Sequence, residues 1–289
     1  MPPIIEPIMR PARLFRYFSP GQSQIFVEQK LWFSTVSDFN DIFEAYPRHD
    51  QIIKETTEKA LKKAYCFDHP EVEISYPDYK KFREPSLRKI IEESNEEAPE
   101  GFQARFSKYF GVVCFTEHLD SLLMWGHYAD CHRGFVIEFN PQHNLFTPPY
   151  FQKVNYGQNR QVLTLTKKLD SGILFYKSSE WDYEDEHRLI KPKTDLSQGT
   201  YSRNGIQTAG HFIPLPMDSI KAVYFGCRIS EEDRNNLLKP LEAFPSIERY
   251  FMRRNQIAYQ LDVVPWKEWK DPTGVRNIIL GIPLNRFAS

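Results

Sequence analysis

Three charged side chains alternate along the segment Tyr183-Glu-Asp-Glu-His-Arg. In an extended strand, alternate side chains point to one face, so Glu184, Glu186 and Arg188 are expected to lie together. Two adjacent carboxylates repel each other, which raises one pKa, and a neighbouring arginine lowers it again. This pattern fits either an ion network on a sheet face or a catalytic carboxylate held by its neighbours.

A second polar segment, Ser37-Asp-Phe-Asn-Asp-Ile-Phe-Glu, directly follows a predicted strand. Its short polar side chains can bond the backbone of a turn, while its two phenylalanines fill the core beneath. In the functional interpretation, at least one polar side chain points into a cleft at the end of the strand. The candidates are Asp38, Asn40, Asp41 and Glu44.

A third segment, Trp125-Gly-His-Tyr-Ala-Asp-Cys-His-Arg-Gly, combines aromatic residues with two histidines. It predicts a short helix that runs into a turn closed by Gly134. His127 and His132 would then flank a pocket, as general bases or ligands. The alternative is a packed aromatic cluster with hydrogen-bonded histidines.

Zinc is a further alternative, because Cys114-x3-His118 and His127-x3-Cys131 supply four ligands. Structural zinc sites usually use closer C-x2-4-C pairs. We therefore expect no metal.

Five motifs follow one another along the chain: Leu14-Phe-Arg-Tyr17; Leu31-Trp-Phe-Ser-Thr-Val-Ser-Asp-Phe-Asn-Asp-Ile-Phe-Glu44; Leu123-Met-Trp-Gly-His-Tyr-Ala-Asp-Cys-His-Arg-Gly-Phe135; Trp181-Asp-Tyr-Glu-Asp-Glu-His-Arg-Leu189; and Val223-Tyr-Phe-Gly-Cys-Arg-Ile-Ser230. In content and order they resemble the bacterial family catalogued as domain of unknown function 2971, from about residue 13 to residue 264. This resemblance implies kinship and conveys little chemistry.

The order Arg16, Ser34-Thr35-x-Ser37, Glu184-x-Glu186 is also similar to the arginine, Ser-Thr-Ser, Glu-x-Glu layout of toxin-type ADP-ribosyltransferases. This similarity implies NAD as a substrate. Arg16 would hold the pyrophosphate through bidentate contacts, and Ser34 and Thr35 would brace the pocket. Glu186 would stabilise the charge that develops as nicotinamide leaves, and Glu184 would orient or deprotonate the acceptor.

An aromatic side chain would stack on nicotinamide in such a site, and Tyr17, Trp125 and Tyr128 are the candidates. The other expected binding residues are Asn40, Asp41, His127 and Arg188.

The elements that position these residues are predicted from hydrophobic spacing. Strands are expected at 12–18, 24–36, 111–116, 134–139, 151–156, 187–191, 211–215, 220–226 and 257–264, and helices at 50–64, 85–110, 121–128 and 230–243. The fold class is α+β, with a strand-rich mixed sheet, inserted amphipathic helices and an ADP-ribosyltransferase-like arrangement as one form of it.

The 289 residues and 41% hydrophobic content suit a single α+β domain over 1–289, with a helical insertion at about 46–110. Four widely spaced cysteines and an opening unlike a signal peptide predict a cytoplasmic protein, and no membrane partner is expected. With 37 basic and 38 acidic side chains, the overall charge does not indicate nucleic acid. Arg253-Arg254 with Lys267 and Lys270 is interpreted as a solvated surface.

The leading hypothesis is an NAD-consuming enzyme that transfers ADP-ribose to an unidentified acceptor or cleaves NAD, in a toxin-like or anti-phage role. The alternative is a non-catalytic recognition or sensor module. It would bind a nucleotide, nucleic acid or protein in the cleft between the 31–44 and 123–135 motifs. A hydrolase or nuclease that uses His127, His132 and Glu184 is the third.

Overall fold

The computed structural model describes residues 10–46, 58, 61–62, 65, 75–85, 98–161, 171–203 and 206–266. Most of the helix predicted at 50–64, the first part of the helix predicted at 85–110, and both Lys267 and Lys270 lie outside the described residues. The described residues form two compact units. Unit 1 takes in those within 10–16, 24–119 and 139–219, and unit 2 those within 17–23, 120–138 and 220–266. The single-domain organisation stays a prediction.

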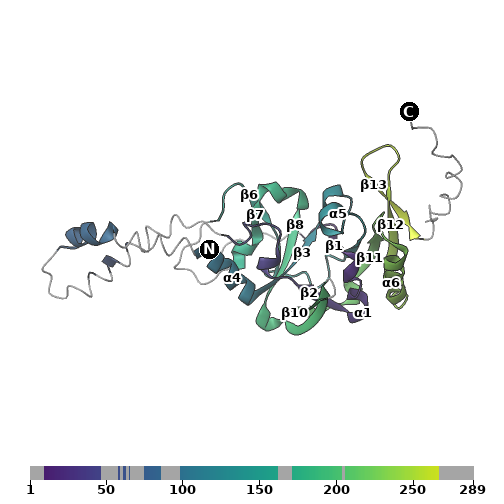
Figure 1. Ribbon diagram of the computed structural model, residues 1–289, viewed down its shortest axis with the longest axis horizontal. Helices are drawn as coiled ribbons and strands as arrows, with labels where there is room; N and C mark the ends of the chain where they lie inside the picture. The colour runs from purple at the N-terminus through teal and green to yellow at the C-terminus, as the bar shows by residue number, and fades with distance from the viewer. Residues whose placement is uncertain are drawn as a thin grey trace, which may run out of the picture. The chain divides into compact units, whose positions relative to one another are not determined.

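The fold is mixed α+β, as predicted, and its largest element is an eight-stranded mixed sheet in the order β13-β12-β11-β4-β1-β3-β8-β5. Figure 1 labels β1, β3, β8, β11, β12 and β13 of this sheet. A three-stranded sheet, β2-β10-β9, and a two-stranded sheet, β6-β7, accompany it. The strands are β1 Leu14–Phe18, β2 Lys30–Phe33, β3 Phe110–Thr116, β4 Phe135–Phe139, β5 Phe151–Lys153, β6 Asn155–Gly157, β7 Tyr176–Ser178, β8 Glu186–Pro192, β9 Ser197–Arg203, β10 Ile206–Pro214, β11 Ile220–Phe225, β12 Glu248–Arg254 and β13 Leu261–Pro265.

The α-helices include α1 Ile25–Glu28, α4 Ala98–Tyr109, α5 Leu122–Tyr128 and α6 Glu231–Leu241. Short 3-10 turns connect the strands. They are η1 Pro20–Gln22, η2 Val36–Asp38, η3 Ser171–Phe175, η4 Ser179–Glu184, η5 Lys193–Asp195 and η6 Met217–Ser219. No helix of the described part of the chain is long and apolar enough to cross a membrane.

Unit 1 is built on the antiparallel pair β3 and β8, whose register sets Thr116 opposite Glu186 and Cys114 opposite Arg188. Because side chains alternate along a strand, these four residues share one face of the pair. Val112 and Ile190 continue that face and pack with Val36, Ala45, Phe106 and η3 into one buried cluster. The opposite face carries phenylalanines packed edge-on, among them Phe115 and Phe151 with ring centroids 6.1 Å apart.

Unit 2 brings the third and fifth motifs together. Gly226 N donates to Gly134 O at 2.9 Å, and Arg228 N donates to His132 O at 3.0 Å. The Tyr224 hydroxyl donates to the buried Glu138 carboxylate at 2.6 Å. The turn after α5 therefore packs against the turn after β11.

The strand predicted at 24–36 is wrong over its first half. Residues Ile25–Glu28 form the helix α1, and Gln29 ends it in the left-handed region with φ of 51°. The apolar run Ile-Phe-Val is typical of a strand. Here Ile25 and Phe26 are instead buried from a single helical turn. The strand within this range is β2, at Lys30–Phe33, and Ser34 follows it as an isolated bridge.

Glu184 also departs from the prediction, because it ends the turn η4 and does not lie in a strand. Asp185 follows in the left-handed region with φ of 43°, and β8 begins at Glu186. The chain therefore turns sharply between the two glutamates.

Candidate functional site

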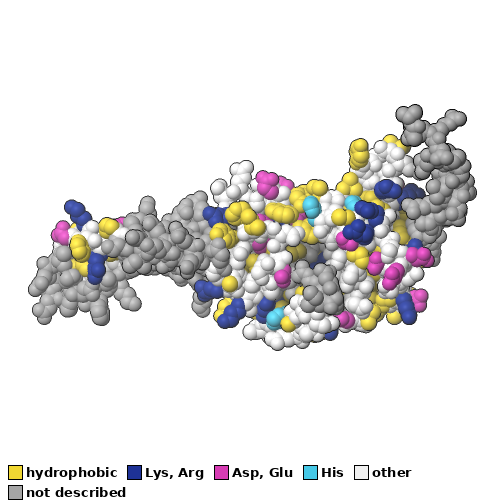
Figure 2. All heavy atoms as spheres, viewed as in Figure 1, with side chains coloured by type: hydrophobic (Ala, Val, Ile, Leu, Met, Phe, Trp, Pro, Cys, Tyr) yellow, Lys and Arg dark blue, Asp and Glu magenta, His cyan; other side chains and the backbone are white. Residues whose placement is uncertain are grey.

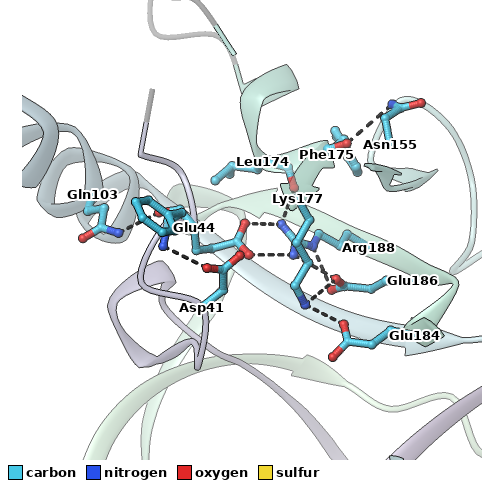
Figure 3. Close-up of polar contacts among 11 residues, drawn as sticks. Asp41, Glu44, Gln103, Asn155, Leu174, Phe175, Lys177, Glu184, Glu186 and Arg188 are labelled. Atoms are coloured by element: carbon cyan, nitrogen blue, oxygen red, sulfur yellow. Dashed lines mark hydrogen bonds and ion pairs between the residues drawn. The ribbon is translucent and has the colours of Figure 1, made fainter. Parts of the chain in front are cut away.

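The guanidinium of Arg188 is fully buried and forms five hydrogen bonds (Figure 3). Nη1 and Nη2 donate to the two carboxylate oxygens of Glu44 at 2.5 and 2.9 Å. Nε and Nη2 donate to the two oxygens of Glu186 at 2.8 and 2.9 Å. Nη1 also donates to the Leu174 carbonyl at 2.5 Å. An arginine has five N–H donors, so its hydrogen-bonding capacity is used in full.

Lys177 supplies the second buried cation from β7. Its Nζ lies 2.5 Å from Glu184 Oε2 and 3.3 Å from Glu186 Oε2. It also lies 4.7 Å from the centre of the Trp181 ring. Glu184 is held further by its backbone, because the Thr116 hydroxyl donates to its carbonyl. We call Glu44, Lys177, Glu184, Glu186 and Arg188 the ionic cluster.

The ionic cluster holds three carboxylates and two cations, so it carries one excess negative charge when all five groups are ionised. Burial alone raises the pKa of Glu186, but Arg188 and Lys177 outweigh it and lower the pKa to about 2. Burial raises the pKa of Glu44, against the effect of Arg188. Glu186 is therefore the firmly ionised acid, and Glu44 is the one that gains a proton more readily than an exposed glutamate.

Cys114 lies beside the ionic cluster on the same face of β3. Burial and the neighbouring Glu186 raise the pKa of its thiol well above the usual value, so the thiol stays protonated. The same thiol interacts electrostatically with Arg16, whose pKa burial lowers to about 10. Arg16 and Glu186, which are far apart in the sequence, thus both interact electrostatically with Cys114.

The loop of residues 41–46 is attached to the ionic cluster through Glu44. Asp41 Oδ1 accepts from Phe43 N at 2.9 Å, while Asp41 Oδ2 is buried without a hydrogen-bond partner among the described residues. Gln103 of α4 donates to the carbonyls of Ile42 and Glu44 at 3.3 and 2.7 Å. These bonds fix the loop from both sides (Figure 3).

The structure gathers only part of the predicted site. Glu184, Glu186 and Arg188 meet, and Asp41 belongs to the adjoining loop. Ser34 pairs with Val112 through its backbone, and the Thr35 hydroxyl donates to Asp38 Oδ2 at 2.8 Å within its own turn. Asn40 is exposed.

Arg16 lies in unit 1, and the other predicted residues belong to unit 2. Trp125 and Tyr17 are buried with ring centroids 5.3 Å apart, and the His132 ring is parallel to Trp125 at 6.2 Å. His127 is exposed and Tyr128 is half-buried. The 31–44 and 123–135 motifs thus fall in different units, and the cleft between them stays a prediction.

Sequence reasoning missed Lys177 as a site residue. It stands between two motifs in the unremarkable run Tyr176-Lys-Ser. The available signal was the charge balance, because two carboxylates at 184 and 186 beside one arginine need a second cation if they are buried. Among the described residues no group of three or more His, Cys, Asp or Glu side chains could hold a metal ion.

Chemically, the arrangement is a closed ion network. Both oxygens of Glu186 accept from cations, and Glu184, Glu186 and Arg188 are buried. A carboxylate in this state can hold a loop in place, and its protonation would weaken the ion pairs around it. To act on a substrate it must first exchange these partners.

No curated protein and no solved structure matches the chain. The comparisons give no support to a similarity with ADP-ribosyltransferases. A family model does match, over residues 124–189, a segment that runs from α5 into β8. Its range covers most of the third predicted motif and all of the fourth. Over residues 124–189, this chain matches the family described as protein of unknown function (DUF2971).

Proposed function

We propose that this chain is a non-catalytic recognition module that binds a protein partner through the exposed side chains of the loop 41–46. The observation that carries the proposal is an inverted pattern of burial. Asp41 and Glu44 are 8% and 1% exposed, whereas Ile42 and Phe43 between them are 75% and 52% exposed. Soluble chains normally bury the apolar residues and expose the acids.

The inversion costs stability on both sides. Leaving Ile42 and Phe43 in water forgoes about 1.5 to 3 kcal/mol each relative to full burial. Burying the Glu44 carboxylate requires the paired guanidinium of Arg188. Departures of this kind are expected at functional sites, where a partner covers the apolar side chains.

The ionic cluster explains how such a surface would bind well. Glu44 is clamped by Arg188, and Gln103 holds the carbonyls on both sides of Phe43. A loop that is already ordered loses less conformational entropy on binding. In this proposal the buried carboxylates support binding and take no part in catalysis.

The surroundings of Phe43 indicate the chemistry of the partner. Tyr46 packs edge-on against its ring with centroids 6.1 Å apart. The guanidinium of Arg160 lies 5.9 Å from the Phe43 ring and 5.4 Å from the Tyr46 ring. An apolar pocket with an acidic group at its rim is the complementary surface.

The test places a photo-crosslinking amino acid at position 43 in the full chain, in living cells. The matched control carries it at Val27, which is also an exposed apolar position. We expect one discrete protein adduct from position 43, none from position 27, and a weaker adduct when Ile42→Ala is added. Equal adducts at both positions, or none at 43, would sink the proposal.

An NAD-consuming enzyme is the second candidate, because Arg16 and Glu186, which are far apart in the sequence, both interact electrostatically with Cys114. The ADP-ribosyltransferase layout requires an arginine and a glutamate in one site. Against it stands the Glu186 carboxylate, which Arg188 and Lys177 bind and which would have to be released first.

Nicotinamide release separates the two candidates. If the chain is an NAD-consuming enzyme, the wild type releases nicotinamide, with or without an acceptor, and the Glu186→Gln variant does not. Circular dichroism confirms that the variant is folded, and Arg16→Lys, which keeps the charge but not the fork, is a second variant. A recognition module releases none in any form.

A further inference from the structure

The hairpin between β12 and β13 in unit 2 presents two apolar side chains to solvent at its tip. Ile257 is 97% exposed and Tyr259 is fully exposed. Figure 2 shows hydrophobic side chains at this tip, and Lys or Arg side chains at the base of the hairpin. The loop of residues 41–46 belongs to unit 1, whereas the hairpin belongs to unit 2.

The tip is an ordered turn. Asn255 Oδ1 accepts from the backbone N–H groups of Ile257 and Ala258, both at 2.8 Å. Asn255 Nδ2 donates to Asp262 Oδ1 at 2.9 Å, and Asn255 N donates to Gln260 O at 3.0 Å. A side chain held out by such a turn is pre-organised for contact.

Two exposed arginines lie at the base of the hairpin, Arg254 at the end of β12 and Arg228 in the turn after β11. Both act electrostatically on the thiol of Cys227 and lower its pKa, although burial has the larger effect and raises it. Within the described ranges neither guanidinium has an ion pair. Asp130, whose pKa Arg228 also lowers, is already bound by Arg133 at 2.7 and 2.9 Å.

We propose that this surface, formed by Arg228, Arg254 and Tyr259, binds single-stranded nucleic acid. The two guanidinium groups would hold backbone phosphates, and a base would stack on the Tyr259 ring. Aromatic rings beside a cationic track are the features with which proteins bind single strands without sequence preference.

The spacing supports this combination. Arg254 pairs with Leu261 across the hairpin, and Tyr259 is two residues from Leu261. Two residues of extended chain span at most about 7 Å. This short span lets the ring and a neighbouring guanidinium contact the same nucleotide or adjacent ones. An acidic protein would use the arginines and would leave the stacking surface of Tyr259 without a role.

The experiment measures fluorescence anisotropy of a labelled oligo(dT) and oligo(U) of about 15 nucleotides with the full chain. Two phosphate contacts predict that affinity falls about 7-fold between about 50 and about 200 mM salt. Tyr259→Ala should weaken binding by about 10-fold. Arg228→Ala with Arg254→Ala should remove most of the salt dependence.

Matched controls are Tyr109→Ala, a tyrosine exposed in unit 1, and Lys221→Ala, an exposed cation on β11. Neither should change the affinity. Thermal denaturation checks that every variant folds, which is expected because the substituted side chains are exposed. No binding by the wild type, equal loss in the controls, or equally tight binding of polyglutamate would each overturn the proposal.

Discussion

Glu44 and Arg188 are separated by 144 positions in the sequence, yet they form a bidentate, fully buried ion pair. The pair joins the second motif to the fourth. Two motifs that are distant in the sequence are therefore in contact in the structure. Its strength decides whether the loop 41–46 keeps its conformation.

The substitution Glu44→Ala should lower the free energy of unfolding by about 3 to 5 kcal/mol, because it leaves the buried guanidinium with two unpaired N–H groups. Urea denaturation measures this loss. Arg133→Ala is the matched control, since it removes an exposed bidentate pair with Asp130, and its loss of stability should be much smaller. Equal losses would mean that the buried pair contributes no more than a surface pair.

Acid should destabilise the chain through Glu186. Its pKa falls from 4.5 to about 2 on folding, so its contribution to stability is complete above pH 4.5 and is lost as the pH falls towards 2. Glu44 has the opposite effect, because its pKa is raised above 4.5 on folding. Its protonation stabilises the folded state below pH 4.5, and this contribution is lost as the pH rises above that value.

Unfolding curves from pH 2 to pH 6 test this assignment. Relative to wild type, Glu186→Gln should flatten the loss of stability below pH 4.5, whereas Glu231→Gln, which changes an exposed acid of α6, should leave it unchanged. If both variants follow the wild-type curve, then Glu186 does not carry the acid sensitivity.

Two glycines of the third motif should respond in opposite ways to alanine. A Cβ at Gly134 would lie 1.9 Å from the Phe18 carbonyl oxygen, which is backbone and cannot move aside cheaply. A Cβ at Gly126, within α5, would meet nothing within 4 Å. Gly134→Ala should therefore prevent normal folding, and Gly126→Ala should stabilise the chain by up to about 1 kcal/mol. Thermal denaturation of the two variants would refute this if both lose stability.

Local sequence patterns predicted those elements that a few neighbouring residues determine, such as an apolar strand or a capped helix start. The apolar run at 111–116 is β3, and Ser121 and Ser230 cap α5 and α6 by accepting from Met124 N and Asp233 N. The strand prediction for 24–36 was wrong over its first half because Ile25-Phe-Val consists of strand-forming residues. Tertiary packing decides that these residues form a helical turn and are buried in that conformation.

The candidate site was predictable only in part. Alternation suggested that Glu186 and Arg188 share a face, and the register of β3 and β8 gives them that face. Glu184 reaches the ionic cluster by another route, because the left-handed Asp185 turns the chain. The partners Glu44 and Lys177 come from distant segments, and no local pattern marks a contact between distant residues.

At the hairpin tip, the ordering of the turn can be tested without removing the side chains that are proposed to contact nucleic acid. Asn255→Ala removes the acceptor of two backbone N–H groups and the bond to Asp262, without removing a side chain proposed to touch nucleic acid. Each lost bond contributes about 1 kcal/mol, so the amides of Ile257 and Ala258 should exchange with deuterium about 10-fold faster or more. Global stability should change little, because the tip is exposed, and Asn236→Ala on the exposed face of α6 should leave these amides unchanged. If pre-organisation matters, oligonucleotide affinity falls together with amide protection. Unchanged protection would show that Asn255 does not hold the turn.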